Sequence, residues 1–416
     1  MKRFVKSSAV SGVIQAPASK SVAQRAIALA SMSDGRSEIL NAGNSDDCHA
    51  AIRVCRELGA TIDGDANQLI VDGGLKLPAR PLNCGESGLS IRMFSPIAST
   101  LNGDITLIGE GSLMNRPMQI ITDALNQFGV ECSTANGFLP IQVKGPMKGG
   151  QISVDGSLSS QVLTGLLMAS PMASSDVTIL VDNLKSIPYV QLTIDMMRKF
   201  GVDVENFNNS EFRIKAPQRY KPCKYNVEGD WSGAAFLLVA GAIAGEVEVT
   251  NLNPRTLQAD RAIINALMWS GAYVSIRENS IFVKKESLAG FDFDATHCPD
   301  LFPPLVALAS HCVGESKILG VGRLKVKESD RAATLMEEFT KLGIDIKVQD
   351  DLMIIQGGNP QSTKVQSHGD HRIAMACAVA TLNGNCEVEI DGAEAVSKSY
   401  PDFFEDLEQL VNLKMS

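Results

Sequence analysis

The sequence has little of what marks membrane, secreted or metal-binding proteins. Aromatic residues make up 5% of its 416 residues, and no apolar run approaches the length of about 18 residues that crosses a membrane. The opening stretch, MKRFVKSSAVSGVIQAP, lacks the apolar core of a signal peptide. The nine cysteines form no CxxC pair and no zinc-finger spacing, so we expect reduced thiols in a cytoplasmic protein.

Nucleotide-binding signatures are missing as well. The chain has no P-loop, and the glycine pairs that begin at Gly109 and Gly320 lack the third glycine of a dinucleotide fingerprint. His368 and His371 have no evident third ligand, so we expect neither a metal ion nor a cofactor. A net charge of −9 argues against a nucleic-acid or anionic-membrane partner, although a local basic pocket is compatible with it.

What the chain does contain is one repeat of about 70 residues, written six times. Each copy has an apolar helical run, a Gly or Ser turn and a short alternating strand. The turn-and-strand pieces recur every 68 to 72 residues and begin at Gly35, Gly103, Ser175, Gly245, Gly314 and Gly384. A second landmark is a helix that ends in glycine, which predicts a left-handed cap, at Gly59, Gly129, Gly201, Gly271 and Gly343.

The order of elements within a repeat indicates an α/β fold, because each copy reads as helix, strand, helix, strand, strand. The sixth repeat lacks its closing strands and the first 15 residues belong to no repeat, so we expect the N-terminal segment to complete the sixth. This predicts one domain of residues 16–228 and another of residues 1–15 plus 229–416, with three repeats in each. The two chain crossings would suit a hinge that closes. One continuous solenoid is the alternative.

Cationic residues gather where the predicted helices begin. A helix N-terminus carries free N–H groups and the positive end of the dipole, so a cation there costs roughly 0.3–1 kcal/mol unless an anion is bound. Seven cations lie in or near such starts: Lys20, Arg25, Arg116, Lys327, Arg331, Arg372 and Lys398. We therefore predict a strongly anionic ligand with two or more phosphate or carboxylate groups.

Single residues among these starts have simpler explanations. Ser159 and Ser160 could serve only to cap a helix, and Gly88 could serve only to permit a turn. Asp330 and Arg331 could form an exposed pair on a helix. Seven basic residues at equivalent ends of the repeats are harder to explain one by one.

Nine short motifs make the prediction specific. In chain order they are ASKSVAQRA at Ala18, SGLSIRM at Ser87, NRPM at Asn115, VDGSLSSQVLTGLLM at Val154, SIPY at Ser186, VEGDWS at Val227, VKESDR at Val326, GDHRIAMA at Gly369 and SKSYPDFF at Ser397. Together the chain resembles the 5-enolpyruvylshikimate-3-phosphate synthase family of enolpyruvyl transferases from Ser19 to Pro401. The resemblance implies a two-domain inverse barrel of six βαβαββ repeats, three per domain, with a cleft between the domains.

The resemblance also implies an activity and a set of site residues. The family condenses shikimate 3-phosphate with phosphoenolpyruvate and releases phosphate, on the way to chorismate and the aromatic amino acids. We expect the protein to be a monomer. Contacts to shikimate 3-phosphate are implied for Lys20, Ser21, Arg25, Ser159, Ser160, Gln161, Ser186, Asp300, Arg323 and Lys327. Contacts to phosphoenolpyruvate are implied for Lys20, Gly88, Arg116, Gln161, Glu328, Arg331, Arg372 and Lys398.

The reaction explains why these residue types are needed. Addition of the 5-hydroxyl to the enol ether needs a base, for which Asp300 is the natural candidate, and a proton carrier at the methylene carbon, Lys20 or Glu328. The tetrahedral phospho-ketal then collapses by C–O cleavage. Phosphorus is never attacked, so the magnesium of most phosphoryl-transfer sites is not required. Arginines and lysines would balance the negative charge of the substrates instead, and their stabilisation would grow when the cleft closes and water leaves it.

Three residues depart from the family's commonest pattern. Glu86 stands where Asn is usual, Leu89 where Thr is usual, and Arg323 where an Asn contacts shikimate. Leu89 adjoins Gly88, which borders the volume of the inhibitor glyphosate in the family, so sensitivity to that inhibitor is open. Whether Arg323 contacts shikimate or points away is open too.

Two other functions are compatible with parts of the sequence. The first is that of the sister enzyme, UDP-N-acetylglucosamine enolpyruvyl transferase; against it, Ser21 stands where that family has Asn, and the loop near Arg116 lacks its Cys. The second is a non-catalytic protein that binds an anionic metabolite. The presence of Lys20, Asp300 and Glu328 argues against the second function, because binding alone needs no acid–base set.

Overall fold

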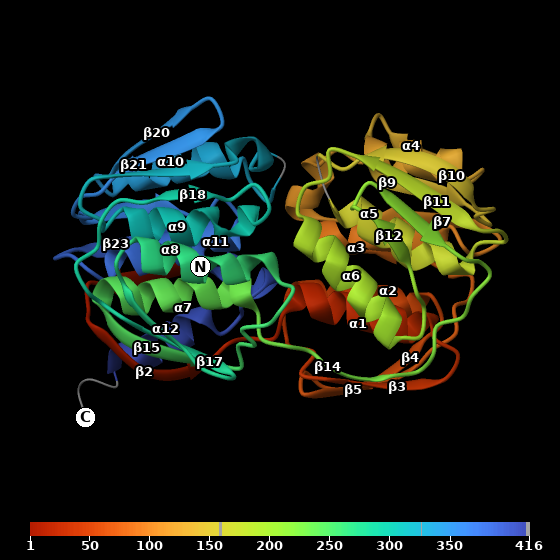
Figure 1. Ribbon diagram of the computed structural model, residues 1–416, viewed down its shortest axis with the longest axis horizontal. Helices are drawn as coiled ribbons and strands as arrows, with labels where there is room; N and C mark the ends of the chain where they lie inside the picture. The colour runs from red at the N-terminus through yellow and green to blue at the C-terminus, as the bar shows by residue number, and fades with distance from the viewer. Residues whose placement is uncertain (158–159, 326, 413–416) are drawn as a thin grey trace. The chain divides into compact units, whose positions relative to one another are not determined.

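The computed structural model describes residues 1–157, 160–325 and 327–412, and the chain divides into two compact units (Figure 1). Unit 1 comprises Met1–Pro17 and Glu228–Ser416, and unit 2 comprises Ala18–Val227. The boundaries expected from the sequence fall within two residues of these. That the units are independent domains of three repeats each stays a prediction.

Unit 2 contains three four-stranded sheets that share one strand order. In each, the first two strands are parallel, and the second pairs antiparallel with the third, which pairs antiparallel with the fourth. The sheets are β14 (Lys224–Asn226), β3 (Arg36–Leu40), β5 (Gln68–Asp72), β4 (Thr61–Gly64); β6 (Leu82–Asn83), β7 (Asp104–Ile108), β9 (Phe138–Lys144), β8 (Glu131–Ala135); and β10 (Gly150–Asp155), β11 (Val177–Asp182), β13 (Glu211–Ile214), β12 (Glu205–Phe207). Alternate residues of β9 are buried, as expected of a strand with one face on a core.

Unit 1 contains two sheets of the same order and a third with three strands. They are β2 (Val10–Gln15), β15 (Gly245–Thr250), β17 (Ser280–Lys284), β16 (Tyr273–Ile276); β18 (Asp292–Asp294), β19 (Glu315–Leu319), β21 (Leu352–Gln356), β20 (Asp345–Gln349); and β22 (Thr363–Gln366), β23 (Glu387–Asp391), β1 (Lys2–Lys6). The N-terminal segment supplies β1, antiparallel to β23 of the sixth repeat, and β2, parallel to β15. Strand β14 takes the equivalent place beside β3, so each crossing of the chain directly follows a strand that is paired in a sheet.

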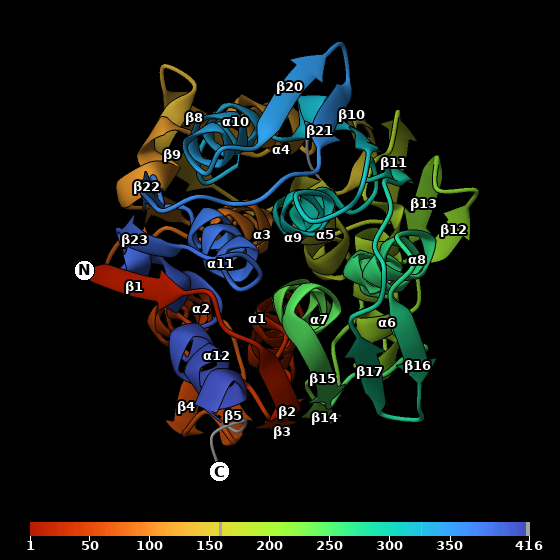
Figure 2. The same ribbon diagram turned by 90° about the vertical axis from the view of Figure 1, so that its left-hand side faces the viewer.

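Each repeat contributes one helix that is buried almost throughout and one amphipathic helix. The first kind fills the middle of each unit, as Figure 2 shows for α7, α9 and α11. These helices are α1 (Lys20–Met32), α3 (Gly88–Ala98), α5 (Ser160–Ala169), α7 (Trp231–Ala244), α9 (Phe302–Ala309) and α11 (His371–Thr381). The amphipathic helices are α2 (Asp46–Glu57), α4 (Gln119–Gln127), α6 (Ile187–Lys199), α8 (Ile263–Trp269), α10 (Arg331–Lys341) and α12 (Phe403–Asn412).

Glycines set two features of this packing. A Cβ on Gly165 of α5 would lie 2.6 Å from the Arg92 carbonyl of α3, so these helices approach backbone to backbone. The predicted left-handed caps are confirmed, because the five glycines that end helices all have φ between 71° and 99°. Among the described residues, no helix combines the length and the apolar composition that crossing a bilayer requires.

Candidate active site

Three helix starts of unit 1 carry the ionisable residues that the sequence singled out there. They are the 3-10 turn η4 (Pro299–Leu301) before α9, the segment that leads into α10, and the first turn of α11. Ion pairs join three carboxylates and three cations of these segments: Asp300, Glu328, Asp370, Lys327, Arg331 and Arg372. The six charges balance, which satisfies the requirement that buried charges be paired.

Asp300 interacts with all three cations. Its Oδ1 lies 2.9 Å from Arg331 Nη1 and 3.1 Å from Lys327 Nζ, and its Oδ2 lies 3.5 Å from Arg372 Nη2. Burial acts to raise the pKa of Asp300, but Arg372, Lys327 and Arg331 outweigh burial and hold that pKa well below its usual range. Asp300 is therefore ionised at neutral pH and can accept a proton.

Arg331 is fully buried and bonded on several sides. Its Nε donates to Asp370 Oδ2 at 2.9 Å, and its Nη2 donates to Glu328 Oε2 at 2.6 Å. Burial opposes the charge, but Asp370, Glu328 and Asp300 raise the pKa of Arg331 above its usual value. Lys327 behaves oppositely: burial and Arg331 lower its pKa although Asp300 acts to raise it. Arg331 is thus a fixed charge, whereas Lys327 is a stronger acid than an exposed lysine.

Arg372 is oriented by the first turn of α7. Its Nη2 donates to Ser232 Oγ at 2.9 Å, and Ser232 Oγ in turn donates to the carboxylate of Asp230, 3.0 Å from both oxygens. Asp230 also caps α7 by accepting the N–H groups of Ser232 and Gly233. The guanidinium of Arg372 is therefore positioned by a side chain that is itself fixed at a helix start.

Two further predicted residues of unit 1 bond backbone carbonyls. Lys398 Nζ donates to Gly369 O at 2.7 Å, and Arg323 Nη1 donates to Thr296 O at 3.0 Å. Burial lowers the pKa of Arg323, and Asp300 opposes this change. Arg323 is therefore close enough to Asp300 for the two charges to interact. A contact between Arg323 and shikimate stays a prediction.

In unit 2, Lys20 is the first residue of α1 and pairs with Asp47 of α2, with 3.0 Å between Nζ and Oδ2. Both side chains are largely buried. The partner Asp47 was not singled out from the sequence. Its position among the first residues of the second helix of the first repeat was a usable signal, because other second helices carry candidate site residues at their starts.

Arg25 is the most unusual cation of unit 2, because its side chain is buried and its bonds go to neutral groups. Its Nε donates to Thr193 Oγ1 at 2.9 Å, its Nη2 to Thr164 Oγ1 at 3.1 Å and its Nη1 to Ser21 O at 2.7 Å. The guanidinium carbon lies 6.0 Å from the ring centroid of Tyr189. Burial lowers the pKa of Arg25 to about 10, and no carboxylate of the described residues pairs with it. This charge would gain much from an anion brought from solution.

The start of α3 lies under two arginine side chains. A Cβ on Gly88 would lie 2.4 Å from Arg116 Nη1 and 2.9 Å from Arg92 Nη1, so glycine leaves room for both guanidinium groups. Arg92 Nη1 also donates to Gln161 Oε1 at 3.1 Å. The structure therefore brings the predicted residues Gly88, Arg116 and Gln161 close to one another.

Two predicted serines of unit 2 lie at helix starts and are buried. Ser160 is the first residue of α5, and Ser186 precedes α6 with a left-handed φ of 53°. The Ser186 side chain makes no capping hydrogen bond to α6, so helix capping does not explain this conformation. Ser159 lies outside the described residues.

The dipole argument made from the sequence holds for only part of the cations. Lys20, Arg331 and Arg372 lie in the first turns of α1, α10 and α11. Arg116 precedes α4, Lys327 precedes α10 and Lys398 ends the 3-10 segment Ala393–Lys398, so their positions opposite a helix dipole were predicted wrongly. These helices begin later than expected, because 3-10 turns and irregular segments occupy the predicted first turns.

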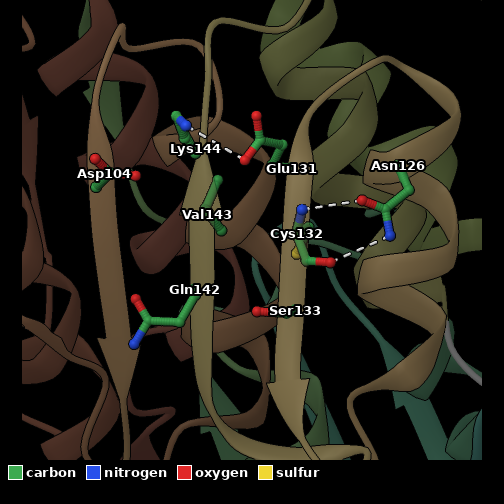
Figure 3. A pocket seen from close by; sticks show the side chains of 8 residues that line it. All are labelled: Asp104, Asn126, Glu131, Cys132, Ser133, Gln142, Val143 and Lys144. Carbon is green, nitrogen blue, oxygen red and sulfur yellow. Dashed lines mark hydrogen bonds and ion pairs between the residues drawn. The ribbon is translucent and has the colours of Figure 1, made fainter.

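A surface hollow of about 440 Å³ lies elsewhere in unit 2, over the sheet of β7, β8 and β9 (Figure 3). Two pairs of its polar residues bond each other: Asn126 bonds both backbone groups of Cys132, and Lys144 pairs with Glu131 at 3.3 Å. None of the predicted site residues lines this hollow.

Comparison with known proteins gives concordant results. The family model described as EPSP synthase (3-phosphoshikimate 1-carboxyvinyltransferase) matches residues 5–407. A 3-phosphoshikimate 1-carboxyvinyltransferase of Clostridium kluyveri is 40% identical over 403 residues, 96% of this chain and 95% of the relative. One from Methanocorpusculum labreanum is 38% identical over 99% of this chain and 98% of its own.

Solved structures agree in fold. An EPSP synthase from Acinetobacter baumannii has a TM-score of 0.82 and 28% identity, covering 99% of this chain and 98% of its own. The enolpyruvyl transferase NikO from Streptomyces tendae has a TM-score of 0.78, covering 98% of this chain and 96% of its own, at 17% identity, which indicates a shared fold alone.

Proposed function

The chain belongs to the EPSP synthase (3-phosphoshikimate 1-carboxyvinyltransferase) family, and from this premise we propose that it transfers the enolpyruvyl group of phosphoenolpyruvate to the 5-hydroxyl of shikimate 3-phosphate. Phosphate is released, and the product leads toward chorismate and the aromatic amino acids. The family match and the full-length relatives support this activity. The roles of single residues are part of the proposal.

Unit 2 supplies the proposed phosphate contacts. Arg25 is the residue that supports this best, because a buried guanidinium bonded to two threonines and a carbonyl keeps its charge and lacks a carboxylate among the described residues. Ser160 and Ser186, with Ser159, would hold the 3-phosphate, and Ser21 and Gln161 would contact the same substrate. Backbone and hydroxyl donors around one arginine suit a phosphate dianion.

Unit 1 supplies the proposed chemistry at the shikimate hydroxyl and most contacts to phosphoenolpyruvate. Arg331, Arg372 and Lys398 would hold its carboxylate and phosphate, and the family resemblance implies contacts of Gly88, Arg116 and Lys20 with the same substrate. Asp300 would accept the proton of the 5-hydroxyl, which Lys327 and Arg323 would help to orient. Glu328 or Lys20 would bring the proton to the methylene carbon.

The electrostatics of Asp300 suggest how its basicity is matched to the reaction. Three cations hold its pKa low, so it is ionised but a weak base. An anionic substrate that shared Arg331 and Arg372 would reduce their effect on Asp300, and the pKa would rise toward the range a general base needs. Substrate binding and base strength would then be coupled through the same guanidinium groups.

The test is phosphate release from phosphoenolpyruvate by the purified protein. We expect release with shikimate 3-phosphate, and none with UDP-N-acetylglucosamine or without a second substrate. Release only with the nucleotide sugar would assign the chain to the sister activity. Binding of both substrates without any release would indicate a non-catalytic protein, and either result would refute the proposal.

A further inference from the structure

A two-residue bend joins β22 to α11 directly before Asp370 and Arg372. Both residues of the bend, His368 and Gly369, have left-handed backbones, with φ of 52° and 69°. Left-handed φ is free for glycine but costs energy for histidine, so something outside the backbone must stabilise the bend.

The carboxylate of Glu338 on α10 provides that stabilisation. Its side chain is fully buried, and it accepts hydrogen bonds from His368 Nε2 at 2.6 Å, from the Gln366 N–H at 3.0 Å and from Lys341 Nζ at 2.8 Å. Two of these three donors belong to the chain that enters the bend. Glu338 therefore ties the body of α10 to the segment that leads into α11.

The bend also contacts a predicted substrate-binding residue on its other side. The carbonyl of Gly369 accepts from Lys398 Nζ at 2.7 Å. The next residue, Asp370, bonds Arg331 and caps α11, whose second residue is Arg372. One short segment thus sets the position of Lys398 by its carbonyl and of Arg372 by the helix that it starts.

A metal site is the competing explanation for the same side chains. Ligand atoms of Glu337, Glu338 and His368 lie within 4.8 Å of one another. The ammonium of Lys341, however, lies 2.8 Å from an oxygen of each glutamate. A lysine already provides the positive charge at this place, so the cluster needs no added cation.

We propose that Glu338 and His368 are positioning residues that fix the His368–Gly369 bend and thereby aim Lys398 and Arg372 at the phosphoenolpyruvate anion. This inference rests on the proposed function. Neither residue belongs to the motifs that carried the resemblance, and neither is expected to touch a substrate. Their effect acts through the two cations, so it should fall on phosphoenolpyruvate rather than on shikimate 3-phosphate.

The informative variant is His368→Asn. Asparagine occupies six of the eight other left-handed non-glycine positions among the described residues, such as Asn41, Asn136 and Asn251, so the backbone should accept it. Its shorter side chain cannot reach Glu338. We expect KM for phosphoenolpyruvate to rise about tenfold, with KM for shikimate 3-phosphate within about twofold of wild type.

Two glutamate variants complete the series. Glu338→Gln keeps an oxygen acceptor for His368 and should give a milder rise in KM for phosphoenolpyruvate than His368→Asn. Glu337→Gln is the matched control, because Glu337 is the neighbouring carboxylate on α10 but is exposed and does not bond the Gln366 N–H. Its KM values should equal those of wild type.

Several outcomes would overturn the inference. One is a His368→Asn variant with a lower melting temperature but an unchanged KM for phosphoenolpyruvate. This result would show that His368 has only a structural role. Another is an equal rise in both KM values. A Zn²⁺-induced rise in melting temperature that requires His368 would favour the metal site instead.

Failure of the proposed function would be recognised separately, because wild type would then release no phosphate in the same assay. In that case a crystal structure of His368→Asn decides the matter. An unmoved bend with the Lys398–Gly369 contact intact would refute the positioning role, and a displaced bend would support it.

Discussion

Replacing Arg25 by methionine should stabilise the protein while abolishing its response to shikimate 3-phosphate. Methionine fills a similar volume without charge. The groups that Arg25 bonds would not be left unsatisfied, because Thr164 and Thr193 already lie 3.2 Å apart and can bond each other. The carbonyl of Ser21 belongs to α1, where a helical N–H can serve it. The substitution therefore removes a buried charge without exposing an orphan polar atom.

The size of the gain follows from the pKa of the arginine. Lowering it from 12.5 to about 10 means that burial costs the charged form about 3 kcal/mol. Loss of the contact with the Tyr189 ring reduces the gain in stability by about 0.5–1 kcal/mol. Replacing the hydrogen bonds from Arg25 by the weaker bond between the two threonines reduces it by about 1 kcal/mol. We expect a net stabilisation of about 1–1.5 kcal/mol, or a few degrees in melting temperature.

The sign of the pH dependence is fixed as well. The folded-state pKa of Arg25 lies below its unfolded value, so the charged arginine destabilises the fold at all pH values below about 10. This cost shrinks only as pH rises from about 10 toward 12.5. The difference between variant and wild type should therefore be constant from about pH 6 to 9.

The assay is urea or thermal unfolding with and without shikimate 3-phosphate. At a ligand concentration 100 times Kd, wild type should gain about 2.7 kcal/mol and Arg25→Met should gain almost nothing. Arg198→Met is the control, because Arg198 lies exposed on α6 and pairs with Asp203 at 3.2 Å; it should behave as wild type. A variant that is less stable without ligand, or that keeps the full ligand response, would refute the reasoning.

Two other substitutions test different parts of the structure. Asp300→Asn should lower turnover by about 10²–10⁴-fold because the base is lost, while calorimetry still detects binding of both substrates; near-normal turnover would exclude Asp300 as the base. His311 probes acid stability, since burial lowers its pKa to about 4. Its folded-state pKa lies below the unfolded value, so stability should fall as pH drops from about 6.5 to 4, by about 2 kcal/mol at pH 5. His311→Gln should remove that loss, and an unchanged acid limb in unfolding curves would contradict the assignment.

The balanced charges of unit 1 change the meaning of the cation pattern. From the sequence, the cations near helix starts indicated an anionic ligand. In the structure, Arg331 and Lys327 already pair with carboxylates, whereas the buried Arg25 bonds two threonine hydroxyls and a backbone carbonyl. The demand for an outside anion is therefore strongest at Arg25, and the other cations would exchange one anionic partner for another.

Much of the fold could be predicted because it depends on local patterns repeated along the chain. The glycine caps were correct, since the left-handed conformation at Gly59 or Gly343 is a property of one residue and its helix. The starts of α4 and α10 were predicted too early, because 3-10 turns and loops share the composition of a helix's first turn. Helix boundaries depend on caps such as the Asp330 carboxylate accepting the Ala333 N–H, which hydrophobic periodicity does not encode.

Spacing and motifs along the chain were enough to predict the repeats, the family and the residue types that the proposed acid–base chemistry needs, because these features are local patterns. Which charges neutralise one another could be seen only in the folded chain. Asp300 and Asp370 both bond Arg331, from positions 31 and 39 residues away, and Glu338 bonds a bend 30 residues further along the chain. Electrostatic partners are chosen by distance in space, and folding brings together residues whose separation along the chain gives no sign of it.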